Sequence, residues 1–217
     1  GVERAHAAGL KAVEISVSAS DTHSRRNAGL SLSEAIEAGE KMARAARGFG
    51  MRIIASIQCA FGCVYEGAVP VHTVLDMARR LQDTGVERIS VADTTGMATP
   101  RSVEILLSGL LPDLGETAAG LHLHDTRGLG LVNLMIGLRH GIAWFDTAFG
   151  GMGGCPFVTG AAGNIPTEDT DYLLASIGIR TGIDRGRVSA CSRKMAQFLE
   201  RALPGRIYRL DAANQDL

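Results

Sequence analysis

Short apolar runs alternate with helix-like segments along almost the whole chain, and this alternation limits the fold more than any other feature. The runs recur at intervals of roughly 30 to 40 residues and are typical of buried strands. We expect five strands, or six if residues 159–162 form another, at residues 12–17, 52–57, 88–92, 119–123 and 142–147. Helices are expected at residues 33–47, 71–82, 100–110, 129–139, 167–176 and 184–203.

Strands separated by helices form βαβ units, and such units build parallel sheets. A (β/α)8 TIM barrel takes about 250 residues. We therefore expect an α/β fold in which residues 1–217 form one partial TIM-barrel catalytic domain, N-terminally truncated by two units, with C-terminal helices from about residue 167. The first residues agree, because they read as a helix end closed by Gly9 without an N-cap before it. A doubly wound sheet is the alternative, but no Gly-x-Gly-x-x-Gly turn follows the first strand.

Charge and hydropathy exclude several classes of function. Lys and Arg number 22 and Asp and Glu 23, so the net charge of −1 provides no field for binding nucleic acid or an anionic membrane. Apolar runs fall short of the roughly 18 residues that a membrane span needs, and the N-terminus does not resemble a signal peptide. The sequence predicts a cytoplasmic protein, or one whose targeting segment is missing. Four cysteines in a chain of this length are expected to be reduced thiols.

Polar side chains follow the expected strands, at the edge where both candidate folds bind ligands. They are Ser18 to Asp21, Gln58, Asp93 to Thr95, His122, His124, Asp125, Asp146 and, past the last strand, Asn164. Carboxylate, imidazole and amide groups that converge from several strand ends are typical of a metal or acid/base site.

His122 and His124 are the sharpest local signal. Side chains at positions i and i+2 of a strand share a face, so both imidazoles can reach one ion. A hydrogen-bonded histidine pair without a metal would have the same pattern. Asp93, Asp125 and Asn164 favour the metal, and a ligand set without a thiolate favours Mg or Mn.

Cys155 follows four glycines in residues 150–156 (GGMGGCP). Such a segment predicts a loop that closes over a site and brings the thiol to it. An ordinary exposed thiol on a turn is the alternative.

Several motifs together resemble one enzyme family. They are residues 122–128 (HLHDTRG) with Asn133, 151–156 (GMGGCP), 160–169 (GAAGNIPTED), 61–67 (FGCVYEG) and 93–96 (DTTG). From about residue 1 to 203 the chain is similar to the 3-hydroxy-3-methylglutaryl-CoA lyases, which belong to the metal-dependent acyl-CoA lyase and Claisen synthase superfamily of TIM barrels. The related synthases usually carry His-x-His-Asn-Asp and lack the Gly-Gly-Cys-Pro loop, so the resemblance favours the lyases.

The resemblance implies a role for each matching residue. His122, His124 and Asn164 would be metal ligands, Cys155 would take part in proton transfer, Glu168 would position the site, and Asp93 would lie beside the metal. The family's Asp-Gly-Leu-Arg segment, which supplies an Asp ligand and a catalytic Arg, does not occur in this sequence. We expect those residues to lie in the missing units, and we expect these 217 residues alone to have little or no lyase activity.

The reaction implied by the resemblance is a divalent-metal-dependent retro-Claisen cleavage of a 3-hydroxy-3-methylglutaryl-CoA-like acyl-CoA to acetyl-CoA and a 3-oxoacid, acetoacetate. The implied partner is an acyl-CoA substrate, with a homodimer as a further expectation. A related lyase, aldolase or synthase acting on another acyl group is one alternative. An inactive truncated scaffold is the other.

Overall fold

A parallel sheet forms the centre of the computed structural model, which describes residues 1–154, 160 and 162–210. Its strands are β1 (Ala12–Ser18), β2 (Arg52–Gln58), β3 (Arg88–Ala92), β4 (Ala118–His122) and β5 (Trp144–Asp146). They pair in the order β1-β2-β3-β4-β5, every pair parallel. Consecutive order is that of neighbouring units in a (β/α)8 barrel, whereas a doubly wound sheet reverses its order at a switch point. The barrel interpretation is therefore confirmed.

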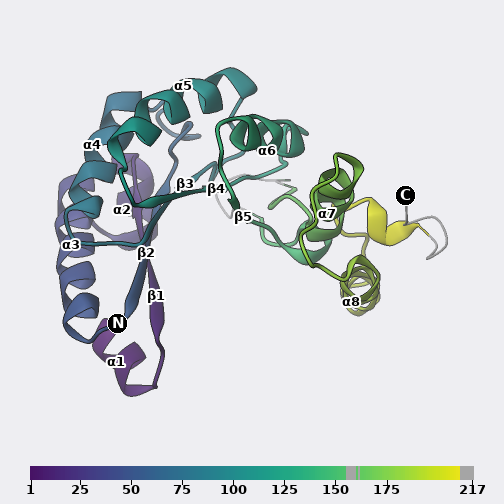
Figure 1. Cartoon of the computed structure of the whole chain (residues 1–217), viewed down its shortest axis with the longest axis horizontal. Helices are drawn as coiled ribbons and strands as arrows, with labels where there is room; N and C mark the ends of the chain where they lie inside the picture. The colour runs from purple at the N-terminus through teal and green to yellow at the C-terminus, as the bar shows by residue number, and fades with distance from the viewer. Residues whose placement is uncertain (155–159, 161, 211–217) are drawn as a thin grey trace.

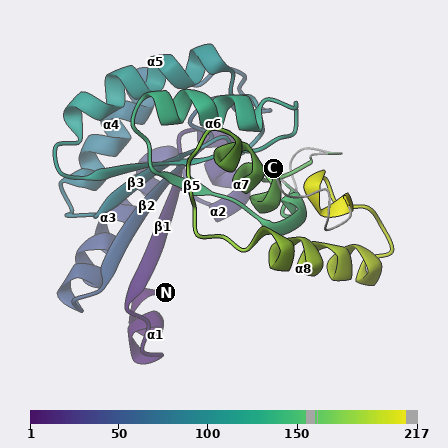
Figure 2. The same cartoon turned by 45° about the vertical axis from the view of Figure 1, so that its right-hand side comes forward.

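Eight α-helices connect and flank these strands in the described residues. They are α1 (Val2–Ala7), α2 (Asp21–Ala28), α3 (Leu32–Gly48), α4 (Val71–Gln82), α5 (Pro100–Leu110), α6 (Gly130–Arg139), α7 (Thr167–Ser176) and α8 (Arg185–Phe198). Short 3₁₀ turns, η1 to η3, cover Leu111–Asp113, Phe149–Gly151 and Ile207–Arg209. Helices α3 to α6 lie along one face of the curved sheet, and α7 and α8 lie beyond β5 (Figures 1 and 2).

The two faces of the sheet differ in polarity because side chains alternate along each strand. On β1, Ile15 and Val17 are buried toward the helices, while Glu14 and Ser16 face the other way into a pocket. The same alternation along β2 to β4 builds an aliphatic core between sheet and helices from Ile53, Ile57, Ile89, Val91, Leu121, Leu81, Leu106 and Leu134. The opposite face is left polar, and it forms the floor of the site.

The strand predictions are confirmed within a few residues, with two differences in the helices. Helix α2 is not expected from the sequence, yet Ser20 caps its start and Gly29 ends it in a left-handed conformation. Helix α8 ends at Phe198 instead of residue 203. The sixth strand suggested for residues 159–162 falls partly outside the described residues, and its described members Gly160 and Ala162 are not in a strand.

No helix in the described part of the chain is long and apolar enough to cross a membrane.

Candidate active site

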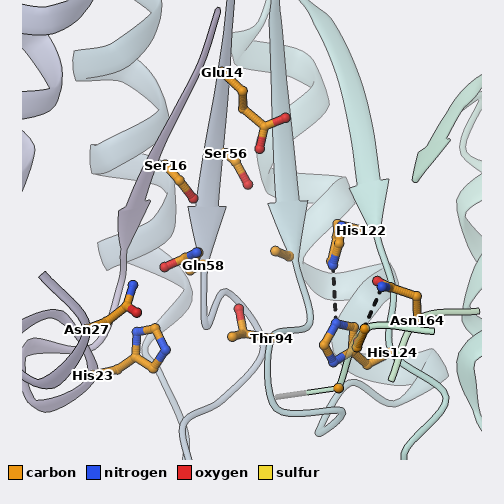
Figure 3. A pocket seen from close by; sticks show the side chains of 13 residues that line it. Glu14, Ser16, His23, Asn27, Ser56, Gln58, Thr94, His122, His124 and Asn164 are labelled. Atoms are coloured by element: carbon orange, nitrogen blue, oxygen red, sulfur yellow. Dashed lines mark hydrogen bonds between the residues drawn. The ribbon is translucent and has the colours of Figure 1, made fainter. Parts of the chain in front are cut away.

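A cavity of about 350 Å³ opens along the polar face of the sheet toward the carboxyl ends of the strands (Figure 3). Its lining residues come from all of β1 to β4 and the turns after β3 and β4, from α2, from the glycine-rich loop and from the segment before α7. They are Glu14, Ser16, His23, Asn27, Ser56, Gln58, Ala92, Thr94, His122, His124, Gly153, Gly154 and Asn164. Apart from one alanine and two glycines, every one of these side chains is polar. The cavity therefore suits a polar ligand or an ion.

The two histidines lie together at the end of β4. Their Nε2 atoms are 3.2 Å apart, and both imidazoles reach the cavity (Figure 3). Leu121 and Leu123, which alternate with them along the chain, are fully buried. Two nitrogens bound to one ion at about 2.1 Å are about 3.0 Å apart at a right angle and about 3.4 Å apart at the tetrahedral angle. The two nitrogens form a hydrogen bond in this structure, and their separation also fits two ligands that share one metal ion.

Asn164 brings an amide to the same place. It pairs with His124 in an isolated antiparallel bridge, and its Nδ2 donates to the carbonyl oxygens of Met152 (2.8 Å) and Gly153 (3.3 Å). These two bonds identify the Nδ2 side of the amide. Its Oδ1 is buried and has no hydrogen-bond partner among the described residues. A buried acceptor without a donor is costly unless a ligand satisfies it.

The candidate ligand set thus contains two imidazoles and one amide oxygen. In the described ranges, no group of three or more His, Cys, Asp or Glu side chains is placed to hold a metal ion. The residues nevertheless fit a divalent cation, because of the nitrogen separation and the unsatisfied Asn164 oxygen.

The protonation state of His124 also suits a metal ligand. Burial and the neighbouring His122 lower the pKa of His124 to about 4, so its ring is neutral at pH 7, as a metal ligand must be. Asp146 lies 3.4 Å from Nδ1 of His122, and this contact is the main reason that the pKa of Asp146 is lowered. Across the cavity, burial and then Asp146 raise the pKa of Glu14.

Asp93 is close to the histidines along the backbone but does not line the cavity. Its amide donates to the His122 carbonyl, and its Oδ1 accepts from the amides of Met97 (2.7 Å) and Ala98 (3.0 Å). Its side chain is buried, and this raises its pKa to about 6. The structure thus places Asp93 as the organiser of the turn after β3.

Glu168 also lies behind the cavity and not in it. It is fully buried near the start of α7, where it accepts from the Gly150 amide and, at 2.7 Å, from the Ser192 hydroxyl. It therefore connects the beginning of the glycine-rich loop to α7 and α8. Cys155, the predicted proton-transfer residue, lies outside the described residues.

Several cavity residues escape a search restricted to strand ends. Glu14, Ser16 and Ser56 lie within strands whose apolar residues dominate the pattern, and His23 and Asn27 lie on α2. The alternation of polar and apolar residues along the strands could have revealed Glu14, Ser16 and Ser56. The spacing of four residues, which puts two side chains on one face of a helix, could have revealed His23 and Asn27.

Comparison with known proteins places the chain in a family. The sequence model of the family described as HMGL-like matches residues 1–195. The chain belongs to the HMGL-like family. It is 38% identical over 201 residues to the cytoplasmic 3-hydroxy-3-methylglutaryl-CoA lyase of Danio rerio, covering 93% of this chain and 60% of that protein. It is 34% identical over 206 residues to a hydroxymethylglutaryl-CoA lyase of Bacillus subtilis, covering 95% of this chain and 69% of that protein.

Solved structures of HMGL-like lyases share the fold. The crystal structure of the Bacillus subtilis HMG-CoA lyase matches with a TM-score of 0.91 and 33% identity over 96% of this chain and 70% of that one. An Acinetobacter baumannii HMG-CoA lyase in complex with coenzyme A and 3-methylmalate matches with a TM-score of 0.90 and 33% identity over 100% of this chain and 70% of that one. The chain spans about three fifths of the length of the first curated relatives.

Proposed function

We propose that the chain carries the metal-binding part of an acyl-CoA lyase site that performs divalent-metal-dependent retro-Claisen cleavage. The proposed substrate is a 3-hydroxy-3-methylglutaryl-CoA-like acyl-CoA, and the products are acetyl-CoA and a 3-oxoacid. The observation that carries the proposal is the pair of Nε2 atoms 3.2 Å apart, together with the buried Asn164 oxygen that has no hydrogen-bond partner in the described part of the chain. Membership of the HMGL-like family and the lyases among its relatives support it.

His122, His124 and Asn164 would hold the cation, for which Mg or Mn is the proposed identity. When bound, such a cation supplies Lewis acidity that lowers the pKa of the substrate's tertiary alcohol. The protein contributes imidazole nitrogen and amide oxygen donors at the end of a short strand and on a neighbouring segment. These positions hold the donors with little freedom, as an ordered ligand set requires.

The other proposed site residues act around this set. Cys155 is the proposed donor of a proton to the enolate carbon after the C–C bond breaks. Glu168 positions the loop that leads to Cys155, because it binds the Gly150 amide. Asp93 shapes the turn that carries Thr94, a cavity residue, through its bonds to Met97 and Ala98.

A second candidate is a related lyase, aldolase or synthase that acts on another acyl group. It is favoured by the cavity floor, where Glu14, Ser16, Ser56 and Gln58 offer hydroxyl, amide and carboxyl groups. If the methyl group of the acyl chain lay against this floor, it would displace water from these polar groups and give them no hydrogen-bond partner, which is unfavourable. An acyl group with an additional hydroxyl or carboxyl group would satisfy them.

Location and assembly remain predictions. The names of the relatives include cytoplasmic and mitochondrial enzymes, so family membership does not decide the cytoplasmic location. A homodimer is proposed as well, and light scattering of the purified protein would test it.

Titration with Mn²⁺ followed by equilibrium dialysis tests the metal site. His122→Ala and Asn164→Ala should each weaken binding by about tenfold or more, since each removes a ligand. His72→Ala is the matched control, because His72 is exposed on α4, remote from the cavity. Equal affinity in all three variants would contradict the site.

Acetyl-CoA release from a panel of acyl-CoA thioesters distinguishes the two candidate reactions. The first predicts the highest kcat/KM with 3-hydroxy-3-methylglutaryl-CoA. A higher value with a more hydroxylated or carboxylated thioester would select the second. Because these 217 residues contain no Asp-Gly-Leu-Arg segment, the panel is run on them and on a version extended by a relative's upstream segment.

A further inference from the structure

Asp146 is an acidic side chain outside the candidate ligand set that contacts one of its members, His122. It ends β5, and the sheet register pairs it directly with His122 on β4. Both side chains project from the same face of the sheet, which puts Oδ2 of Asp146 3.4 Å from Nδ1 of His122. The opposite ring nitrogen, Nε2, is the one that faces His124. The two nitrogens of one imidazole therefore have different neighbours.

A neutral imidazole carries its proton on one nitrogen only, and the neighbours of the ring decide which one. A carboxylate accepts hydrogen bonds, so Asp146 favours the tautomer with the proton on Nδ1 of His122. With the proton on Nδ1, Nε2 of His122 is an acceptor. In the metal-free protein it accepts from Nε2–H of His124, and the same lone pair can bind a cation. Without the carboxylate, the Nε2–H form would compete, and a protonated Nε2 cannot bind a cation.

Two further residues, Ser90 and Arg88, interact with Asp146. The Ser90 hydroxyl donates to the same Oδ2 at 3.5 Å, from the strand on the other side of His122. Arg88 also faces Asp146 and helps to lower its pKa, while its guanidinium packs over the ring of Trp144 at 4.4 Å. Two further carboxyl groups interact with His122: Glu14 on β1, which also faces Asp146, and Asp93 in the turn after β3.

We infer that Asp146 is a positioning residue that fixes the Nδ1–H tautomer of His122 and thereby presents Nε2 to a divalent cation. The second half of this inference rests on the proposed metal site. The first half concerns only the protein's own residues and holds without a metal. Partial exposure of both side chains, 31% for His122 and 44% for Asp146, weakens the interaction through solvent screening.

The test uses Asp146→Ala with Glu14→Gln as its matched control. The control removes the carboxyl group on β1 that interacts with both Asp146 and His122, and it leaves the contact between Asp146 and His122 intact. In the metal-free protein, ¹⁵N imidazole NMR reports the tautomer of each histidine, with His122→Ala identifying the signal. We expect the Nδ1–H form of His122 in the wild type and in Glu14→Gln, and a substantial Nε2–H population in Asp146→Ala.

Mn²⁺ affinity provides the second measurement. Losing a partner of a metal-bound histidine commonly costs 10 to 100-fold in affinity. Because of the exposure, we expect about tenfold for Asp146→Ala and less than threefold for Glu14→Gln. If Asp146→Ala does not fold, Asp146→Asn replaces it, with the same directions and a loss of about threefold or more.

The outcomes separate the two proposals. An unchanged His122 tautomer in the Asp146 variant overturns the inference, whatever the metal affinity. A changed tautomer in a protein whose wild type does not bind Mn²⁺ supports the role of Asp146 and contradicts the proposed metal site. A changed tautomer with affinity equal to the wild type overturns the second half of the inference. A changed tautomer with the expected loss supports both.

Discussion

Replacing Glu168 should destabilise the protein by an amount that can be worked out from its hydrogen bonds. The fully buried carboxylate accepts from two donors, the Gly150 amide at 3.0 and 3.1 Å and the Ser192 hydroxyl at 2.7 Å. A buried donor left without a partner costs about 1–3 kcal/mol. Ser192 can turn toward the Val188 carbonyl at 3.2 Å, so its cost falls at the low end. The expected loss for Glu168→Ala is therefore about 2–4 kcal/mol.

Urea denaturation followed by circular dichroism measures this loss, and a double-mutant cycle apportions it. Ser192→Ala alone should cost about 1 kcal/mol, because it removes one donor together with its acceptor contact. Glu168→Ala combined with Ser192→Ala should cost less than the sum of the single changes by about 1 kcal/mol, since each substitution already removes the shared bond.

The position of the bonds also predicts where the change is felt. Hydrogen exchange should speed up most at the Gly150 amide in Glu168→Ala, whereas the amides of β2 should speed up by no more than the global loss of stability accounts for. Glu168→Gln keeps one acceptor oxygen and should lose about half as much stability. A loss below 1 kcal/mol in Glu168→Ala, or strictly additive single and double variants, would refute the anchoring role.

Three other predictions follow from the site and the core. The pKa of Asp93 is raised from 3.8 to about 6, so the stability it contributes is complete below pH 3.8 and is lost as pH rises through 6. At about 1.4 kcal/mol per pKa unit, metal-free Asp93→Asn should gain up to about 3 kcal/mol on the wild type between pH 4 and 7.5, and a flat difference would contradict this. Cys155 should be alkylated faster than the exposed Cys191, substrate should protect it, and Cys155→Ser should lose turnover; full turnover would remove its role. Gly137→Ala should cost about 1–3 kcal/mol in thermal or urea unfolding, because its new methyl would lie 2.5 Å from Leu121.

Much of the fold could be predicted from the sequence, because alternating polarity marks the strands. For example, Ile15 and Val17 alternate with polar residues and pack into the core, and β1 forms where this pattern predicts it. Helix α2 could not be found this way, since most of its residues are polar and its apolar face is short. Its signals were the caps Ser20 and Gly29, which are weak without a periodic segment between them.

The site shows the same division. His122, His124 and Asn164 meet because strand ends meet, and this depends on topology that the sequence reveals. The contacts of Asp93 and Glu168 could not be predicted, because their partners include backbone amides, which any residue type supplies. Only the path of the chain decides which amide faces which carboxylate.

The Asn164 side chain has two chemically distinct ends, and this has a thermodynamic consequence. Its nitrogen binds the Met152 and Gly153 carbonyls, and its buried oxygen has no hydrogen-bond partner among the described residues. A ligand that binds the oxygen holds the amide in its present orientation. It thereby also stabilises the two hydrogen bonds from the amide nitrogen to the backbone of residues 152 and 153. Linkage is reciprocal, so a substrate that orders this backbone must raise affinity for the ligand by the same factor. One amide therefore couples occupancy of the cavity to the shape of its rim.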